Sequence, residues 1–448
     1  MVLKLPLPDD FHASVVRRID ANGDQRTDLF VGNAGDGPDQ VLLNEKRGWR
    51  VVALDTGDGR TLAATVADLD RDGHEDIVIG KSTGLVLAMG DGKGGFKVHW
   101  LSREGATAWS LAVADLNNDG WVDLIAGRRA ASGNSPLVWI NEGVHDAGAV
   151  PRFHPSGTIA GCCDIKAVAL ADLRIDGYLD LMVLHDDGAI DAYINDSEGH
   201  LREQPAMLPP GPWSGMAVHD IDNNVAADVF VYRRKAGDGP PVYRLLHNNG
   251  QGDFTDVTAA SGLQVNRPIA RAWWVDANTD GFQDLMLADA SGDALEMIPQ
   301  IEDLKFGKPA TLVTGSLVPG PTLISGDLNQ RGDFELIGPM RDAALGVLNT
   351  GSHGHHWVGL RLSTKNHAPV LGTFAVLTRP DGSVVAGQLT STGPLLLGLG
   401  WRTQVSVMAI YWANGIISRI HPDRVDKYWD FTQPDNPYQG TGQRAVPR

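Results

Sequence analysis

A short acidic phrase recurs through the chain, and its spacing limits the possible fold more than any other feature. Residues 68–80 read DLDRDGHEDIVIG, and residues 115–127 read DLNNDGWVDLIAG. Seven related phrases begin at intervals of 48, 47, 57, 48, 56 and 51 residues, at Asp20, Asp68, Asp115, Asp172, Asp220, Asp276 and Asp327. A recurring period of this length indicates a repeat architecture.

Each repeat contains four short β-like runs. In the first unit these runs are SVVRRI, TDLFVG, QVLLN and WRVVAL, with the acidic loop between the first two. Four strands in about fifty residues is the pattern of a propeller blade, and seven such units would close a ring. The 53 glycines and 25 prolines fit a turn-rich chain. We therefore predict an all-β fold, with a seven-bladed β-propeller over residues 1–350. An open solenoid or tandem sandwiches are the alternatives.

The acidic loops carry oxygen-bearing side chains at their first, third, fifth and ninth positions. Calcium takes six to eight oxygens at roughly 2.3–2.6 Å, and alternate residues of a tight loop can supply them. We predict about four to five bound Ca²⁺ ions; the alternative is a set of Asx-rich turns that bind nothing. The predicted ligands are Asp20, Asn22, Asp24, Asp28, Asp68, Asp70, Asp72, Asp76, Asp115, Asn117, Asp119, Asp123, Asp220, Asp222, Asn224, Asp228, Asp276, Asn278, Asp280 and Asp284.

Three loops depart from the pattern. The loop at Asp220 keeps its four oxygen-bearing side chains but lacks the bend glycine, and it is still counted among the predicted sites. The loop at Asp172 carries Arg174 at its third position, and we expect this guanidinium to pair with the neighbouring carboxylates. The loop at Asp327 has Arg331 at its fifth position and Glu335 at its ninth, and we expect it to hold no ion. The formal charge is 38 − 55 = −17. Five Ca²⁺ ions would add ten positive charges, so the acidic loops are interpreted as structural cation cages.

Charge and composition also limit the partners and the compartment. The strong negative charge argues against nucleic acid or an anionic membrane surface as partner. No apolar run is long enough to span a bilayer, and we expect a monomer without membrane insertion. The first residues, MVLKLPLPDDFH, lack a secretory pattern, so either the protein is cytoplasmic or a leader has been removed. With only Cys162 and Cys163 present, no disulfide framework is expected.

The pattern D-x-[DN]-x-[DN]-G-x-x-D, followed by an apolar strand, resembles the FG-GAP/VCBS repeats of the integrin α-chain head and its bacterial relatives. The likeness covers about residues 10–350. It implies a calcium-binding propeller in which each acidic loop joins the innermost strand to the second strand, on the lower face. The N-terminal VLKLPLP is then expected to supply the fourth strand of the seventh blade.

A different β-rich segment follows at residues 351–422. The stretch HWVGLRL, the pair GT at 372–373, LLLGLG at 395–400 and IYWANG at 410–415 resemble the ASPIC/UnbV domain, which follows FG-GAP repeats in cartilage acidic protein and in many bacterial proteins. This resemblance implies a secreted or periplasmic, non-catalytic protein. Residues 423–448 are polar and rich in Pro and Gly, and we expect a loosely held tail.

The loops opposite the acidic face are the predicted ligand-binding region, for a glycan or a protein partner. Tryptophan faces stack on sugars or cations, and arginines suit carboxylates and phosphates. The alternative is that the tryptophans wedge between blades and the arginines pair with nearby aspartates. The predicted ligand-binding residues are Trp109, Arg128, Arg129, Trp213, Arg271 and Trp273.

Two other functional classes stay open, although we lean against catalysis. One is an enzyme on the same scaffold, a polysaccharide lyase or dehydratase or a tailoring protein of natural-product biosynthesis as for UnbV-like proteins. Its candidate groups are His185, Tyr232 and Arg233, and a shared deep pocket would favour it. The other is a lectin with repeated pockets between blades. The pair Cys162–Cys163 is either two thiols, a strained disulfide or a soft-metal site, and SHGHHW at 352–357 is a weak transition-metal candidate.

Overall fold

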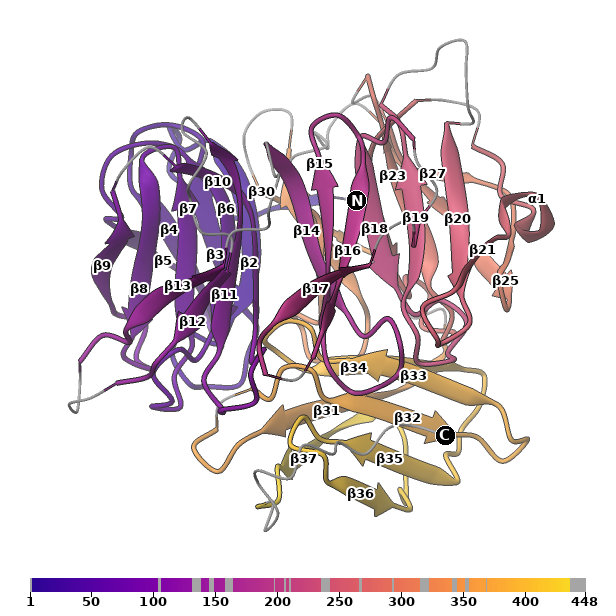
Figure 1. Ribbon diagram of the computed structural model, residues 1–448. Coiled ribbons are helices and arrows are strands. Elements are labelled where there is room, and N and C mark those ends of the chain that lie inside the picture. The colour runs from indigo at the N-terminus through magenta and orange to yellow at the C-terminus, as the bar shows by residue number, and fades with distance from the viewer. Residues whose placement is uncertain are drawn as a thin grey trace.

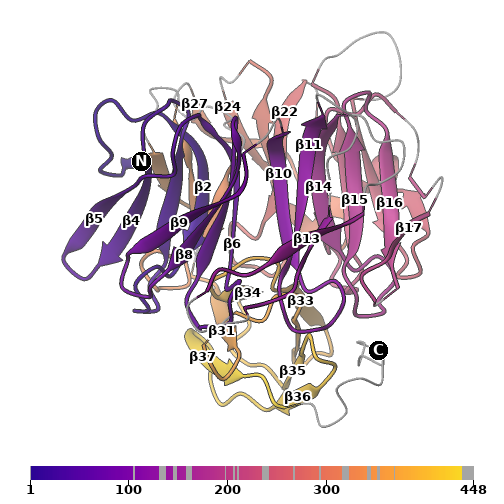
Figure 2. The ribbon, with the colours of Figure 1, turned by 60° about the vertical axis from the view of Figure 1, so that its left-hand side comes forward.

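The computed structural model describes residues 2–103, 106–130, 138–144, 149–157, 164–196, 198–204, 207–208, 211–234, 242–265, 268–291, 294–314, 322–340, 345–350, 354–367 and 369–435. Nearly all regular structure in this part of the chain is β, which confirms the predicted fold class. Seven four-stranded antiparallel sheets are arranged around a common centre, and a separate β domain lies below them (Figure 1, Figure 2).

Six of the seven sheets use four consecutive strands of the chain, apart from a small insertion in the sixth. The first three sheets comprise β2 (Ala13–Ile19), β3 (Asp28–Asn33), β4 (Asp39–Glu45), β5 (Gly48–Leu54); β6 (Thr61–Ala67), β7 (Asp76–Lys81), β8 (Gly84–Gly90), β9 (Phe96–Ser102); and β10 (Ala106–Ala114), β11 (Asp123–Ala130), β12 (Val138–Asn141), β13 (Phe153–Gly157).

The next three sheets repeat this order. They comprise β14 (Ile165–Ala171), β15 (Asp180–His185), β16 (Ile190–Asn195), β17 (Leu201–Gln204); β18 (Gly215–His219), β19 (Asp228–Tyr232), β20 (Tyr243–Asn248), β21 (Phe254–Asp256); and β22 (Ile269–Val275), β23 (Asp284–Asp289), β24 (Ala294–Ile298), β27 (Ala310–Thr314). The insertion in the sixth sheet is the hairpin β25 (Gln300–Glu302) and β26 (Lys305–Phe306), and a single short helix, α1 (Thr258–Ser261), follows β21. Within the described residues, no helix is long and apolar enough to cross a membrane.

The seventh sheet joins the two ends of the repeat region. Its strands β28 (Ile324–Gly326), β29 (Glu335–Pro339) and β30 (Leu345–Asn349) are completed by the N-terminal strand β1 (Val2–Lys4). β1 runs antiparallel to β30, with Leu3 opposite Val347. The buried Leu5 extends this contact by donating its backbone N–H to Leu345 O at 3.0 Å. The expected contribution of the N-terminal segment to the last blade is therefore confirmed.

The sheets pack face to face through shared apolar clusters. One such cluster joins Val15 and Phe30 of the first sheet to Ile77 and Val86 of the second. Another joins residues of the seventh sheet, such as Val347, to the first sheet, so the ring is continuous across its ends. Since the first strands of successive sheets contact one another, they line the centre. Seven four-stranded sheets packed in this way are consistent with the predicted seven blades.

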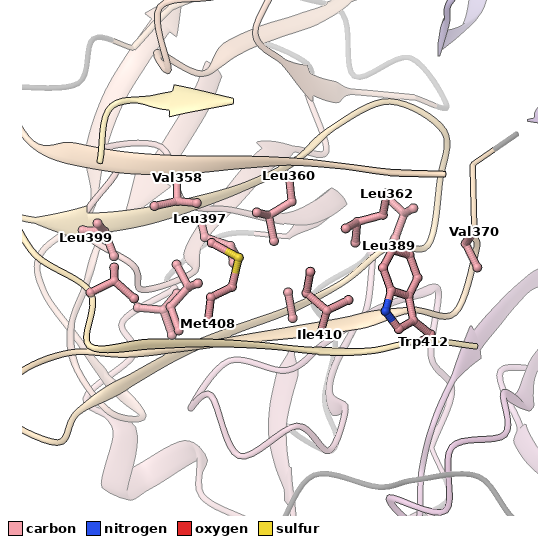
Figure 3. Packing of buried hydrophobic residues seen from close by; sticks show 14 residues of the cluster. Val358, Leu360, Leu362, Val370, Leu389, Leu397, Leu399, Met408, Ile410 and Trp412 are labelled. Atoms are coloured by element: carbon pink, nitrogen blue, oxygen red, sulfur yellow. The ribbon is translucent and has the colours of Figure 1, made fainter. Parts of the chain in front are cut away.

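The C-terminal domain is a pair of packed sheets. The first contains β34 (Leu395–Gly400), β31 (His356–Ser363) and β37 (Lys427–Thr432), and the second contains β33 (Val384–Gln388), β32 (Phe374–Thr378), β35 (Val407–Tyr411) and β36 (Ile417–Ile420). Side chains from both sheets, such as Leu360, Leu397 and Met408, meet in a buried core, with Trp412 at one end (Figure 3).

The predicted tail boundary at residue 423 was wrong. Residues 427–432 form β37, which pairs in parallel with β31 over six residues, from Val358–Lys427 to Ser363–Thr432. The side chains of Trp429 and Phe431 pack against the domain core. Their alternation with polar neighbours is a weak strand signal in a segment that is polar on average. The domain therefore extends at least to the end of this strand, and residues 436–448 of the predicted tail lie outside the described residues.

Candidate metal loops and the opposite face

Each acidic segment lies between the first and second strands of its sheet, as the repeat pattern predicts. We name these segments loop one to loop seven, at residues 20–28, 68–76, 115–123, 172–180, 220–228, 276–284 and 327–335. In loop two the fourth residue, Arg71, and the sixth, Gly73, both have positive φ, at 60° and 93°. This bend turns alternate side chains inward. Loop five lacks the glycine and instead holds Val225 at a φ of 79°, a strained conformation for a β-branched residue.

Backbone amides hold the carboxylates of each loop in place. In loop two, Gly73 N donates to Asp68 Oδ2 at 3.0 Å, and Asp72 N donates to Asp70 Oδ1 at 3.2 Å. His74 N then donates to Asp72 Oδ1 at 2.8 Å. These nested turns gather like charges that would otherwise repel one another.

Loop two has the geometry of a divalent cation site. One oxygen each from Asp68, Asp70 and Asp76 lie within 4.8 Å of one another. Two oxygens bound to the same Ca²⁺ at about 2.4 Å can lie no farther apart than about 4.8 Å, so each pair of these oxygens is within the range that two ligands of one ion can have. In addition, Asp68 Oδ1 is buried without a hydrogen-bond partner. A buried carboxylate oxygen left in this way needs a cation or a proton.

Burial raises the pKa values of several carboxylates in the acidic loops. Desolvation raises the pKa of Asp28 and Asp123 to about 7. Backbone N–H donors oppose this rise, and neighbouring carboxylates add to it. The same causes raise the pKa of Asp76 to about 8. Desolvation followed by repulsion from Asp280 raises the pKa of Asp276 to about 8. Without a counterion, these carboxylates are partly protonated near neutral pH.

The ninth residue of six of the seven loops also connects two strands through backbone hydrogen bonds. In loop three, Asp123 Oδ2 accepts from Leu116 N at 2.8 Å, and Asp123 Oδ1 accepts from Asn141 N at 2.9 Å. The same pair of bonds recurs at Asp28, Asp76, Asp180, Asp228 and Asp284. The ninth position is therefore structural whether or not an ion is bound.

The sequence interpretation missed a second feature that recurs in successive sheets, a buried Asn or Gln amide. The third strand of most sheets ends in a buried amide whose side chain donates to a carbonyl of the preceding sheet's acidic loop. Asn141 Nδ2, for example, donates to Leu69 O of loop two at 2.9 Å. The others are Asn44 to Leu328 O, Asn195 to Leu116 O, Asn248 to Leu173 O and Gln300 to Ile221 O. The recurring N in VLLN, VWIN, AYIN and LLHN is the signal that could have identified them.

The second sheet has Gly90 at this position and uses a different link. Glu75 of loop two accepts a hydrogen bond from Asp20 N of loop one at 2.7 Å. Burial raises the pKa of Glu75 to about 8, while the Asp20 N–H bond opposes this rise. Each of these links fastens one acidic loop to the next.

Protein groups bond carboxylates of loops four and seven. In loop four, Arg174 Nη2 donates to Asp176 Oδ2 at 2.6 Å, which is the expected pairing. In loop seven, the hydroxyl of Tyr428, from β37, donates to Asp327 Oδ2. Loop five contains a nitrogen donor that the sequence interpretation missed, because His247 Nδ1 lies 3.1 Å from Asp228 Oδ1 and 3.4 Å from Asp222 Oδ2.

The C-terminal domain contacts the propeller along the acidic loops. Gly400 N donates to Thr279 O of loop six at 3.1 Å, and Ala386 N donates to Asn223 Oδ1 of loop five at 2.8 Å. The indole of Trp357 occupies the space where a Cβ would stand at Gly332 of loop seven. The acidic face therefore forms an interface within the chain.

The predicted ligand-binding residues do not form one surface. Trp109 is 40% exposed, but Trp213 is only 2% exposed. Trp213 packs in the apolar cluster between the fourth and fifth sheets, so the prediction that it binds a ligand was wrong. Arg271 lies beside the buried Tyr232 hydroxyl. Trp273 lines the central cavity instead of the end loops. The side chains of Arg128 and Arg129 lie outside the described residues.

The candidate catalytic groups are likewise not gathered in a pocket of the described residues. His185 Nε2 lies 2.8 Å from Asp191 Oδ2, and Tyr232 and Arg233 are 3% and 9% exposed. None of the three lines the central cavity.

The histidine segment contributes to the domain interface. His355 Nδ1 bonds Asn278 O at 2.8 Å, and His356 Nδ1 bonds Asp426 Oδ2 at 2.7 Å. These two side chains therefore have separate partners and do not converge on a shared metal. His353, Cys162 and Cys163 lie outside the described residues.

Comparison with known proteins agrees with this architecture. The FG-GAP-like repeat family matches residues 20–79, 68–126 and 172–231, and the FG-GAP repeat family matches residues 107–150. Each match contains at least one acidic loop with its flanking strands. The chain therefore carries FG-GAP repeats on a β-propeller-like scaffold.

Similar solved structures are distant in sequence. BBS1N in complex with ARL6DN shares 11% identity, with 79% of this chain and 98% of that chain covered and a TM-score of 0.50. The Neurospora crassa Pan2 WD40 domain shares 7% identity over 78% of this chain and 94% of its own, with a TM-score of 0.44. An Agrocybe aegerita lectin that recognises non-reducing terminal N-acetylglucosamine shares 18% identity over 68% and 81%, with a TM-score of 0.47. At this identity the likeness concerns the fold alone.

Proposed function

We propose that this protein is a calcium-stabilised recognition propeller that binds a glycan or protein partner through the end opposite its acidic loops. The observation that carries the calcium part is loop two, where oxygens of Asp68, Asp70 and Asp76 lie within 4.8 Å of one another and one buried oxygen of Asp68 has no hydrogen-bond partner. Four to five loops would hold ions, with loops four and seven excluded because Arg174 and Tyr428 bond their carboxylates.

The location of the C-terminal domain supports the choice of the opposite end. The domain contacts loops five, six and seven, so the acidic face is engaged within the chain. The indole of Trp109, on the first strand of the third sheet, is the most exposed of the predicted ligand-binding side chains with a described environment. An exposed indole can stack on a sugar or pack against a protein partner.

Two finer parts of this proposal rest on sequence resemblance. Residues 351–422 resemble the ASPIC/UnbV domain, and the FG-GAP repeats agree with an extracellular or periplasmic location. The formal charge of −17 disfavours nucleic acid as a partner, and we expect the chain to act as a monomer.

Glycan-array binding, measured with calcium and after chelation, tests the proposal. We expect binding to one glycan class that is lost on chelation and weakened at least tenfold in Trp109→Ala. Trp401→Ala is the matched control, because Trp401 is 74% exposed but lies on the C-terminal domain. If no glycan binds, pull-down of extracellular proteins by the wild type and by Trp109→Ala tests the protein arm. A partner captured equally by both, or bound through Trp401, would contradict the proposed face.

A further inference from the structure

A cavity of about 560 Å³ lies at the centre of the ring of sheets. All seven first strands contribute to its wall: β2, β6, β10, β14, β18, β22 and β28. On the side of the C-terminal domain, residues 389–392 and 394–397 complete the lining. Thr392 Oγ1 donates to Arg18 O at 3.2 Å, which fixes this segment against the first strand. The volume is in the range of small-molecule sites.

The wall of this cavity combines an apolar part with polar side chains. Val66, Leu111, Val168, Met216 and Ile324 come from five different strands, and Trp273 adds an aromatic surface. This apolar part of the wall can accommodate an aliphatic or aromatic group.

Two arginines interrupt the apolar wall, and they differ in their partners. Arg18 Nη2 donates to Ser391 Oγ at 2.7 Å, and Glu75 attracts its charge. Arg17 donates only to the carbonyl of its neighbour Val16, at 2.8 Å, and no carboxylate among the described residues forms an ion pair with it. Burial lowers the pKa of Arg17 to about 10, so the guanidinium remains charged at neutral pH.

The acidic groups that reach the cavity are engaged elsewhere. Asp276 accepts from Gly281 N at 2.9 Å, and Asp327 accepts from Gly332 N at 2.7 Å. His219 Nδ1 lies 2.9 Å from Asp220 O. Asp276 and Asp327 therefore share the cavity with Arg17, but neither forms an ion pair with it among the described residues. A partly buried guanidinium that lacks an ion-pair partner can be stabilised by a bound anion.

We propose that the central cavity binds an elongated apolar molecule that carries one anionic head group, with the carboxylate or sulfate on Arg17 and the apolar body along the inner strands. This proposed site is distinct from the cage of loop two, although Asp276 of loop six and Asp327 of loop seven lie in its wall. The guanidinium of Arg17 is not a predicted calcium ligand, so loss of the calcium proposal would not by itself overturn this one. The ligand class follows from the guanidinium of Arg17, which forms no ion pair with a described carboxylate, beside the apolar part of the wall.

Calorimetric titration with three ten-carbon probes tests this proposal: decanoate, decanol and decyltrimethylammonium, each below its micellar concentration. We expect decanoate to bind once per chain, at least tenfold tighter than decanol, and the cationic probe not to bind. Arg17→Gln should weaken decanoate at least tenfold and leave decanol unchanged. Arg202→Gln is the charge-matched control, because the Arg202 side chain is 78% exposed and outside the cavity.

A second variant separates loss of the site from loss of the fold. Thr65 lines the cavity and is only partly buried, so Thr65→Trp should fill the cavity and abolish binding of both decanoate and decanol. Thermal unfolding of each variant verifies the fold. Equal binding of the three probes, binding of decanoate unchanged by Arg17→Gln, or binding retained by Thr65→Trp would each overturn the proposal.

Discussion

At the scale of single residues, the carboxylates of the acidic loops have two different roles, candidate metal ligation and hydrogen bonding between strands. In the sequence both kinds of residue look alike. In loop two the first and third positions, Asp68 and Asp70, each place an oxygen within 4.8 Å of the other and of Asp76. The ninth position of the loops, such as Asp123, is bonded by two backbone amides and connects strands. The spacing of the acidic residues predicted where the acidic loops lie, and their calcium cages stay a prediction. The hydrogen bonds between sheets could not be predicted from that spacing.

Asp68→Asn tests the cage at its buried oxygen. The variant removes one ligand charge, so we expect it to lose most of the stabilisation that calcium gives through this site, about 2.7 kcal/mol at a hundredfold excess over Kd. In chelator, its free energy of unfolding should equal or exceed that of the wild type, because repulsion with Asp70 and Asp72 is relieved. Denaturant unfolding with and without calcium measures both values. The exposed Asp10→Asn is the control, and a loss equal in both buffers would contradict the metal role.

Asn141→Ala tests the amide links between sheets. Asn141 is fully buried, and its removal leaves Leu69 O and Val122 O without this donor. Since an unsatisfied buried polar group costs about 1–3 kcal/mol, we expect a destabilisation of that size, independent of calcium. Chemical denaturation measures it, and Gln251→Ala, at an exposed amide, should change little. A neutral effect of Asn141→Ala would show that the link is dispensable.

At the scale of strands and loops, periodicity was a reliable guide to the repeat region and a poor one to its borders. The four-strand unit, the position of each acidic loop and the closing strand β1 follow from the alternation of apolar runs and turns. The strand β37 was missed because its residues, such as Lys427 and Asp430, are polar where they face solvent. Its pairing depends on β31, about seventy residues earlier, which local patterns do not reveal.

The candidate ligand site shows the same limit. Trp109 and Trp213 are alike in sequence, yet one is exposed and the other is buried between sheets. Trp213 packs where the fourth and fifth sheets meet, close to Gly188. Such burial is a property of neighbouring repeats, so a tryptophan's own context could not predict it.

Leu5→Ala tests the closure of the seventh sheet. Leu5 is 5% exposed and packs in the cluster that joins the seventh and first sheets. Truncation of a buried leucine costs about 2–5 kcal/mol, and we expect a loss in this range if closure stabilises the whole ring. Leu3→Ala is the control, because Leu3 is 59% exposed. Equal melting temperatures for Leu5→Ala and the wild type would contradict a stabilising closure.

At the scale of the whole molecule, the propeller and the C-terminal domain share the acidic face. Tyr428, Trp357 and His355 of the domain each contact a different part of loops six and seven. A change in the charge of these loops should therefore alter the contacts at the domain interface as well as those within each sheet.

Calcium and protons should compete for this face. Burial raises the pKa of Asp76 from 3.8 to about 8 and that of Asp28 from 3.8 to about 7. Between the unfolded and the folded pKa of each group, the folded, metal-free chain therefore holds more protons than the unfolded chain. These groups therefore make the stripped protein less stable as pH rises from about 4 to 8. Because bound calcium replaces the protons, the rise in Tm on adding calcium should grow over the same interval. Scanning calorimetry of stripped and loaded protein at pH 5 to 8 measures it, and a constant or shrinking difference would contradict the account.

The number of calcium ions bound per chain distinguishes a propeller with filled acidic loops from one whose loops hold no metal. Chelator-stripped protein would be dialysed to equilibrium against calcium, and the bound metal would be determined by atomic emission. We predict four to five ions per chain, and one fewer in Asp68→Asn. Zero bound ions in correctly folded protein, or binding unchanged by Asp68→Asn, would contradict the account.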